Sequence, residues 1–220
     1  MSYTAVVTEG SQAQRVARLK RTELLEAAVD ELVAHGWRGL QMQAVAKRVG
    51  VSRQTVYNTF SGRDGLAAAM IEYLTDSFLD GFDDAFATGE SPAGRWENGV
   101  RYLLRRGDDD PALRAMLGLD SGKQFLGLLT SGSAPIVSRA RERIPATVLR
   151  SQPELDLARL THVAELLARL TLSEIVQPIA ELEAAVFTVS EMVAGFLGVK
   201  VVGGVGDSRS HDLRVTGGVV

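Results

Sequence analysis

The chain has 220 residues, a formal net charge of −3 and no cysteine. The missing cysteines exclude a disulfide scaffold, thiolate catalysis and every zinc site that uses sulfur. This length suffices for one or two domains that fold around hydrophobic cores. No apolar run reaches the ~18 residues of a membrane span, and residues 1–10 lack the pattern of a secretory signal. We therefore expect a cytoplasmic protein with no membrane partner.

The first helix that the sequence predicts carries an apolar stripe over Leu25–Val33 and ends at Gly36. Two short helices follow, Met42–Val49 and Ser52–Phe60, on either side of a turn at Gly50. Helical spacing continues in the rest of the chain, and no segment sustains the alternation of a β-strand. The predicted fold class is therefore all-α.

Longer helices are predicted beyond residue 60. Ser61 and Asp64 are expected to cap a fourth helix that runs to about Ala87. A fifth should end at Gly107, and Pro145 should interrupt an ambiguous stretch at 135–150. This fifth helix covers 92–106. The remaining predicted helical segments are one that is capped by 108–110, and 122–130, 153–176 and 178–197.

The charge is unevenly distributed along the chain. Residues 11–63 contain nine Lys or Arg and four Asp or Glu, a net charge of +5, whereas residues 64–220 carry −7. A basic segment joined to an acidic remainder is typical of a protein whose basic part meets a polyanion. The basic segment is therefore the candidate nucleic-acid contact.

The two short helices have the residue pattern of a helix-turn-helix. Small Ala46 and the turn at Gly50 let them cross closely around a wedge of valines. On the exposed face of the second helix, Arg53 and Gln54 can form bidentate bonds to guanine and adenine edges. The alternative is a plain helical hairpin with a solvated polar face. The basic charge of this part of the chain favours DNA binding.

Residues 21–75 resemble the DNA-binding domain of TetR-family transcriptional regulators. The segment VAKRVGVSRQTVYNTFSGRDGL, which starts at Val45, carries the resemblance. It has the family's Val-Ala, Gly-Val-Ser, Tyr, Phe and basic-acidic-x-Leu at matching spacings. The resemblance covers about a quarter of the chain, and the remainder matches only in length and helical pattern. It implies a homodimeric regulator whose helical body binds a ligand that controls the affinity for DNA.

The resemblance also assigns the residues that contact DNA. It places Arg53 and Gln54 at the base-reading start of the recognition helix. Arg63 stands where the family usually has a lysine that touches phosphate, and Gln41 replaces the usual threonine cap of the second helix. The expected DNA-binding residues are Gln43, Ser52, Arg53, Gln54, Thr55, Tyr57, Asn58 and Arg63.

Three parts of the chain are expected. Residues 1–64 form the helix-turn-helix domain with its N-terminal arm, residues 65–199 the ligand-binding and dimerisation domain, and residues 200–220 a flexible glycine-rich tail. We interpret the arm, residues 1–18, as a disordered leader. A minor-groove contact by the arm is the alternative.

The body lacks a converging set of catalytic groups. His162 and Glu165 could place two metal ligands on one helix, but one such pair is a weak signal. Gly203–Gly206 lacks the flanking strand and helix of a phosphate-binding loop. We therefore expect no enzyme activity, no cofactor and no metal site.

Aromatic residues of the body either fill a core or line a pocket between helices. Few charges lie among them, so a small lipophilic effector is the expected ligand. The residues expected to line its pocket are Phe78, Trp96, Tyr102, Phe125 and Leu128.

The last two predicted helices carry long apolar stripes. By resemblance they pair with a second copy into a four-helix bundle. The expected dimer interface contains Leu182, Val186, Val189, Val193 and Phe196.

These features predict a homodimeric, ligand-responsive repressor that binds a palindromic double-stranded DNA operator and is released by a lipophilic effector. A transcriptional activator and a constitutive DNA-binding dimer without a ligand remain alternatives. A filled core in the body would favour the constitutive dimer. A helical enzyme with a DNA-binding head is disfavoured by the missing catalytic groups.

Overall fold

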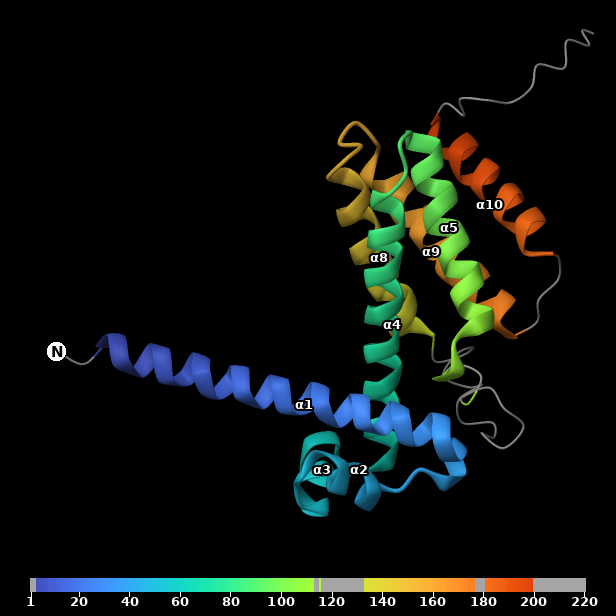
Figure 1. Ribbon diagram of the computed structural model, residues 1–220. Coiled ribbons are helices and arrows are strands. Elements are labelled where there is room, and N and C mark those ends of the chain that lie inside the picture. The colour runs from blue at the N-terminus through green and yellow to red at the C-terminus, as the bar shows by residue number, and fades with distance from the viewer. Residues whose placement is uncertain (1–2, 113–114, 116–132, 177–180, 200–220) are drawn as a thin grey trace, which may run out of the picture.

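The computed structural model describes residues 3–112, 115, 133–176 and 181–199. All regular secondary structure in these ranges is helical, which confirms the all-α class. Figure 1 shows α1, α2 and α3 grouped around one end of α4, with the remaining helices bundled along its other half. The predictions for residues 122–130 and 200–220 lie outside the described residues. The helices are α1 (Tyr3–Gly39), α2 (Met42–Val49), α3 (Arg53–Phe60), α4 (Arg63–Ala87), α5 (Pro92–Asp109), α8 (Ala134–Leu149), α9 (Leu157–Val176) and α10 (Leu182–Leu197).

The first helix, α1, is longer than its apolar stripe. Gly36 interrupts it with φ 65° and ψ 174°, which confirms the break predicted there. The helix begins at Tyr3, so the expectation of a disordered leader is wrong from that residue onward. Residues 11–21 are rich in Ala, Gln, Arg, Leu and Lys, which favour helix without needing a buried face.

The bounds predicted for α2 and α3 are confirmed. Gly50 ends α2 in the left-handed conformation, with φ 70°, and this conformation favours glycine. The hydroxyl of Ser52 then caps α3 by accepting a hydrogen bond from the N–H of Thr55 at 3.1 Å. Gln41 occupies the N-cap of α2 without a side-chain cap.

The capping pair predicted for α4 is wrong. Ser61 instead ends α3 in the left-handed conformation, with φ 58°, and Gly62 becomes the N-cap of α4. A capping box needs its serine in extended backbone at the N-cap. The position of Ser61 therefore excludes that role, whereas the end of α4 at Ala87 agrees with the prediction.

Two expected interruptions do not break their helices. Helix α5 runs through Gly107, and α8 runs through the buried Pro145. An interior glycine costs only about 1 kcal/mol, and buried neighbours offset the hydrogen bond that a proline removes. The predicted cap after α5 is present: the carboxylate of Asp110 accepts from the N–H of Ala112 at 2.8 Å.

Apolar side chains gather in two clusters. The head cluster is formed mainly by α1, α2, α3 and the first half of α4, and the body cluster by the second half of α4 with α5, α8, α9 and α10. Helix α4 contributes Leu66 to Leu74 to the head and Leu79 to Phe86 to the body. Helix α4 runs through residue 64, where the sequence predicts the boundary between two domains, and it connects the two cores. The domain boundary stays a prediction.

Ion pairs join α4 to α8 beside the body cluster. Arg139 pairs with Asp76 at 3.1 Å, and Arg143 pairs with Asp80 at 2.7 Å and Asp83 at 2.9 Å. Hydrogen bonds to both carboxylates raise the pKa of the Arg143 guanidinium above its ordinary value. These pairs lie on the body half of α4 and help fix the position of α8 along it.

Candidate nucleic-acid interface

Helix α3 lies on the head with one apolar edge inward. Val56 and Phe60 are 0% and 4% exposed and belong to the head cluster. Their i, i+4 spacing places both on the buried side of a helix only two turns long. The remaining side chains of α3 are polar, and most of them are exposed. The fold thus presents the polar face that the sequence predicts.

The exposed face of α3 contains two side-chain pairs. An Nη of Arg53 donates to the hydroxyl of Tyr57 at 3.1 Å, and the guanidinium lies 5.1 Å from the centre of the Tyr57 ring. The Nε2 of Gln54 donates to the Oδ1 of Asn58 at 2.8 Å. Each pair restricts two polar side chains in advance and so reduces the conformational entropy lost when a partner binds.

Other residues predicted to contact DNA on α2 and α3 are exposed. Gln43 is exposed on α2, and Thr55 is exposed on α3. The hydroxyl of Ser52 lies 2.9 Å from that of Thr55 as well as capping the helix. Ser52 therefore has a structural role, and its contact with DNA stays a prediction.

Arg63 serves the fold of the head. Its guanidinium lies 4.5 Å from the centre of the buried Trp37 ring, and one Nη donates to the Trp37 carbonyl. The contact joins the start of α4 to the end of α1. The residue is exposed overall, so the predicted phosphate contact is sterically open and stays a prediction.

Sequence reasoning missed the ion pairs that hold α2 on α1. Arg48 donates to Asp30 at 2.8 Å and to Glu31 at 2.9 Å. Asp30 and Glu31 lie 18 and 17 positions before Arg48 in the chain, so no local spacing indicates these contacts. They fix α2, which in turn supports the turn before α3.

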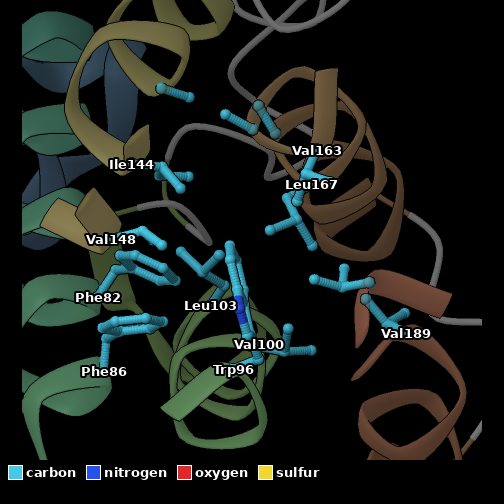
Figure 2. Close-up of a cluster of buried hydrophobic side chains, with 14 of the residues drawn as sticks. Phe82, Phe86, Trp96, Val100, Leu103, Ile144, Val148, Val163, Leu167 and Val189 are labelled. Carbon is cyan, nitrogen blue, oxygen red and sulfur yellow. The ribbon is translucent and has the colours of Figure 1, made fainter. Parts of the chain in front are cut away.

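One of the expected pocket residues, Trp96, lies inside the body cluster. It is fully buried, and its ring meets Phe86 edge-on with centroids 5.3 Å apart and Phe82 at 6.4 Å. Figure 2 shows the indole with Phe82 and Phe86 of α4 on one side and Val100 and Val189 on the other. The buried Nε1 of Trp96 has no hydrogen-bond acceptor among the described residues.

Two other expected pocket residues meet around Arg106. The guanidinium of Arg106 lies 5.3 Å from the Phe78 ring centre, donates to the Tyr102 hydroxyl at 2.9 Å and pairs with Asp110 at 3.3 Å. Tyr102 and Arg106 line an open cavity of about 370 Å³ at the end of α5. Phe125 and Leu128 lie outside the described residues.

The five residues expected at the dimer interface lie mostly inside the protomer, and their place in an interface stays a prediction. Val186, Val189 and Val193 are buried in the body cluster, and Leu182 packs against it. Side chains that fill the protomer's own core have little surface left for contact with a second chain. Of the five expected residues, Phe196 is the one that faces outward, at 45% exposed.

Other large apolar side chains are exposed on α9 and α10. We call the exposed set the outer face; besides Phe196 it contains Leu157, Leu166, Phe187 and Met192. The sequence offered a signal for it, because α10 is apolar on more than one side.

Two absences concern the described ranges alone. No helix in them is long and apolar enough to cross a membrane. No group of three or more His, Cys, Asp or Glu residues in them could hold a metal ion. Glu165, considered above as a metal ligand, pairs with Arg169 at 2.9 Å, and its pKa is lowered, chiefly by that hydrogen bond.

The chain matches known proteins at both ends of the fold. Residues 24–70 match the family described as bacterial regulatory proteins, tetR family, and residues 93–195 match the bacterial tetracyclin repressor, C-terminal domain. The regulator AlkX of Mycobacterium tuberculosis is 31% identical over 136 residues, 60% of this chain and 63% of that protein. RutR of Escherichia coli is 26% identical over 111 residues, half of this chain and 51% of that protein. The chain thus spans less than two thirds of these curated relatives.

Solved structures agree with this match. A TetR-family repressor AlkX from Dietzia sp., implicated in biodegradation of n-alkanes, superposes with a TM-score of 0.71 at 27% identity, covering 81% of this chain and 95% of that one. QsdR of R. erythropolis superposes with a TM-score of 0.62 at 18% identity, covering 86% and 99%, and shows the fold alone. The two family matches together cover more than half of the residues. The chain therefore belongs to the TetR family of bacterial transcriptional regulators, which are not enzymes.

Proposed function

We propose that the protein is a ligand-responsive repressor in the cytoplasm that binds a palindromic DNA operator as a homodimer. The exposed polar face of α3 is the observation that carries this proposal. Arg53 and Gln54 lie at the start of that helix, where a recognition helix reaches base edges in the major groove. The basic charge of residues 11–63 supplies attraction to phosphate.

Selection of genomic fragments by the purified protein tests DNA binding. The wild type should enrich fragments that share a roughly palindromic sequence. Arg53→Ala and Gln54→Ala should each lose roughly 1–3 kcal/mol on the selected operator and relax the choice of base at one position per half-site. Arg105→Ala, an exposed arginine on α5, is the matched control. Unchanged discrimination between operator and scrambled DNA in both α3 variants would contradict the assignment.

The outer face of α9 and α10 supports the homodimer. Phe187 and Met192 are 67% and 68% exposed on adjacent turns of α10, and Leu166 on α9 is 63% exposed. A group of large exposed apolar side chains marks a surface that another protein covers. A second copy, with its own α9 and α10, presents the same apolar surface and satisfies two-fold symmetry.

A lipophilic effector is supported by the body and by one relative. The relative AlkX from Dietzia sp. is implicated in biodegradation of n-alkanes, and it aligns with 81% of this chain. The body cluster is apolar, yet it contains the indole N–H of Trp96 without an acceptor among the described residues. A buried donor without a partner costs about 1–3 kcal/mol. An apolar ligand that carries one oxygen, such as an alkanol or a fatty acid, would relieve this cost.

A panel of n-alkanes, alkanols and fatty acids tests the effector. A ligand that prefers the non-binding conformation should raise Tm and weaken operator binding together. Trp96→Phe removes the indole N–H and should reduce the preference for alkanols and acids over alkanes. If no compound changes DNA affinity, the constitutive dimer becomes the better description. Activation of transcription from the selected operator would instead favour the activator.

A further inference from the structure

The first part of α1, Tyr3 to Arg21, extends from the head beside the recognition helix, and we call it the basic arm. In Figure 1, α1 continues well past α3, on the side away from the body. Residues 14–20 of this arm are all exposed. Residues 14–21 contain Arg15, Arg18, Lys20 and Arg21 and no acidic residue. The stretch lies before residues 24–70, which match the family's DNA-binding domain, so this domain does not account for it.

Arg21 fixes the base of the arm against α3. One Nη of Arg21 donates to the carbonyl of Thr59 at 3.3 Å, and its guanidinium lies 4.8 Å from the centre of the Phe60 ring. Both partners are at the C-terminal end of the recognition helix. The direction in which the arm leaves the head is therefore tied to the position of α3.

Arg15 and Arg18 continue a row of side chains that begins at Arg21. Residues three apart follow one another along a helix surface, so the three arginines wind along one side of the arm. In the part of the chain that the structure describes, neither Arg15 nor Arg18 takes part in an ion pair, whereas Lys20 pairs with Glu23 at 3.6 Å. Two unneutralised guanidinium groups therefore stand on an exposed helix that is anchored to the recognition helix.

We propose that this arm binds the sugar–phosphate backbone of duplex DNA next to the half-site that α3 reads. The inference rests on the proposed DNA-binding function and extends it to Arg15 and Arg18. The arm from Tyr3 to Arg21 is about 28 Å long at 1.5 Å per residue. That length is comparable to one turn of duplex, so the arm can reach phosphates outside the half-site. Phosphate contacts fix position without reading sequence.

The positive charge of the arm favours DNA over a second protein as its partner. The arm also exposes Val16 and Leu19, at 59% and 58%, which is a small apolar surface. Four basic residues in eight positions would repel a second copy of the same arm. A polyanion that already lies beside α3 neutralises them and releases counterions.

The test compares two duplexes and two double variants. The short duplex ends at the edges of the selected operator, and the long one adds about 10 base pairs of mixed sequence on each side. Arg15→Gln/Arg18→Gln removes two charges and keeps good helix formers in the arm. Arg105→Gln/Arg141→Gln removes the same charge from two exposed positions of the body and is the control.

The wild type should bind the long duplex more tightly than the short one, by roughly 5-fold per phosphate contact at about 0.15 M salt. In the arm variant this advantage should disappear, and the slope of log K against log salt on the long duplex should fall by about 1.8 per head. The control variant should keep both. An arm variant that matches the wild type, a control that loses as much, or an equal loss on the short duplex would overturn the inference. A wild type that binds neither duplex would refute DNA binding itself.

Discussion

Replacing Phe187 and Met192 with lysine should convert the proposed dimer into monomers. The two side chains are 67% and 68% exposed on the outer face, so lysine is accommodated there without disturbing the protomer. Surface substitutions of this kind change protomer stability by about 0.5 kcal/mol or less. A charge at Val189 would not separate dimerisation from folding, because Val189 is 8% exposed and a charge there would unfold the body.

The expected loss can be worked from the exposed fractions. Complete burial of a Phe or Met side chain contributes about 1.5–3 kcal/mol. A two-fold axis counts each residue twice, so burying the remaining two thirds of four side chains contributes about 4–8 kcal/mol. Losing about 4 kcal/mol of association free energy weakens dimerisation roughly 1,000-fold. Lysine also adds like charges to both sides of the proposed interface and increases the loss.

Sedimentation equilibrium over a wide concentration range measures this change directly. The control is Val33→Lys/Ala34→Lys, which adds the same charge to exposed positions on α1. The outer-face variant should sediment as a folded monomer with unchanged helical circular dichroism, and the control should behave as the wild type. If the outer-face variant dimerises as tightly as the control, the two-fold interface lies elsewhere on the chain.

Two further predictions concern the head. Arg63→Ala removes the guanidinium that contacts the Trp37 ring and should lower the free energy of unfolding, measured in urea, by about 1 kcal/mol. A variant as stable as the wild type would show that this contact does not stabilise the head. Burial, together with the neighbouring Glu26 carboxylate, raises the pKa of Tyr73 above its ordinary 10.0, so stability should fall as pH rises from about 10 through the folded-state pKa. Tyr73→Phe should remove this alkaline loss in urea titrations at several pH values, and an identical pH dependence in both proteins would refute the cause.

Local signals explain why the head could be predicted from the sequence. The caps and turns of α2 and α3 depend on residues within a few positions of one another, as with Ser52 and Thr55 or Gly50 and Ala46. The apolar spacing of Val56 and Phe60 then decides which face of α3 stays outside. Each of these contacts joins residues only a few positions apart in the chain. The residue types and their spacing are therefore enough to predict them.

Other local predictions failed where neighbouring elements competed for the same residue. Ser61 could cap the start of α4 or end α3. Because α4 begins only two residues after Ser61, Ser61 ends α3 and Gly62 takes the N-cap of α4. Pro145 reads as a break in isolation, yet burial in the body cluster keeps α8 continuous. The arm before residue 21 has no apolar stripe, so periodicity gave no reason to extend α1 through it.

The sequence by itself determined the all-helical class, the two short helices and the polar residues between their buried positions, because each follows from contacts along one or two turns. Only the tertiary structure decided which side of α10 faces inward. That helix is apolar on several sides, and α5 and α9 packed against Val186, Val189 and Val193, leaving Phe187 and Met192 outside. Tertiary packing also brought Arg48 to Asp30 and Arg106 to Phe78. Contacts between residues far apart in the chain depend on how whole helices pack, and no local pattern encodes them.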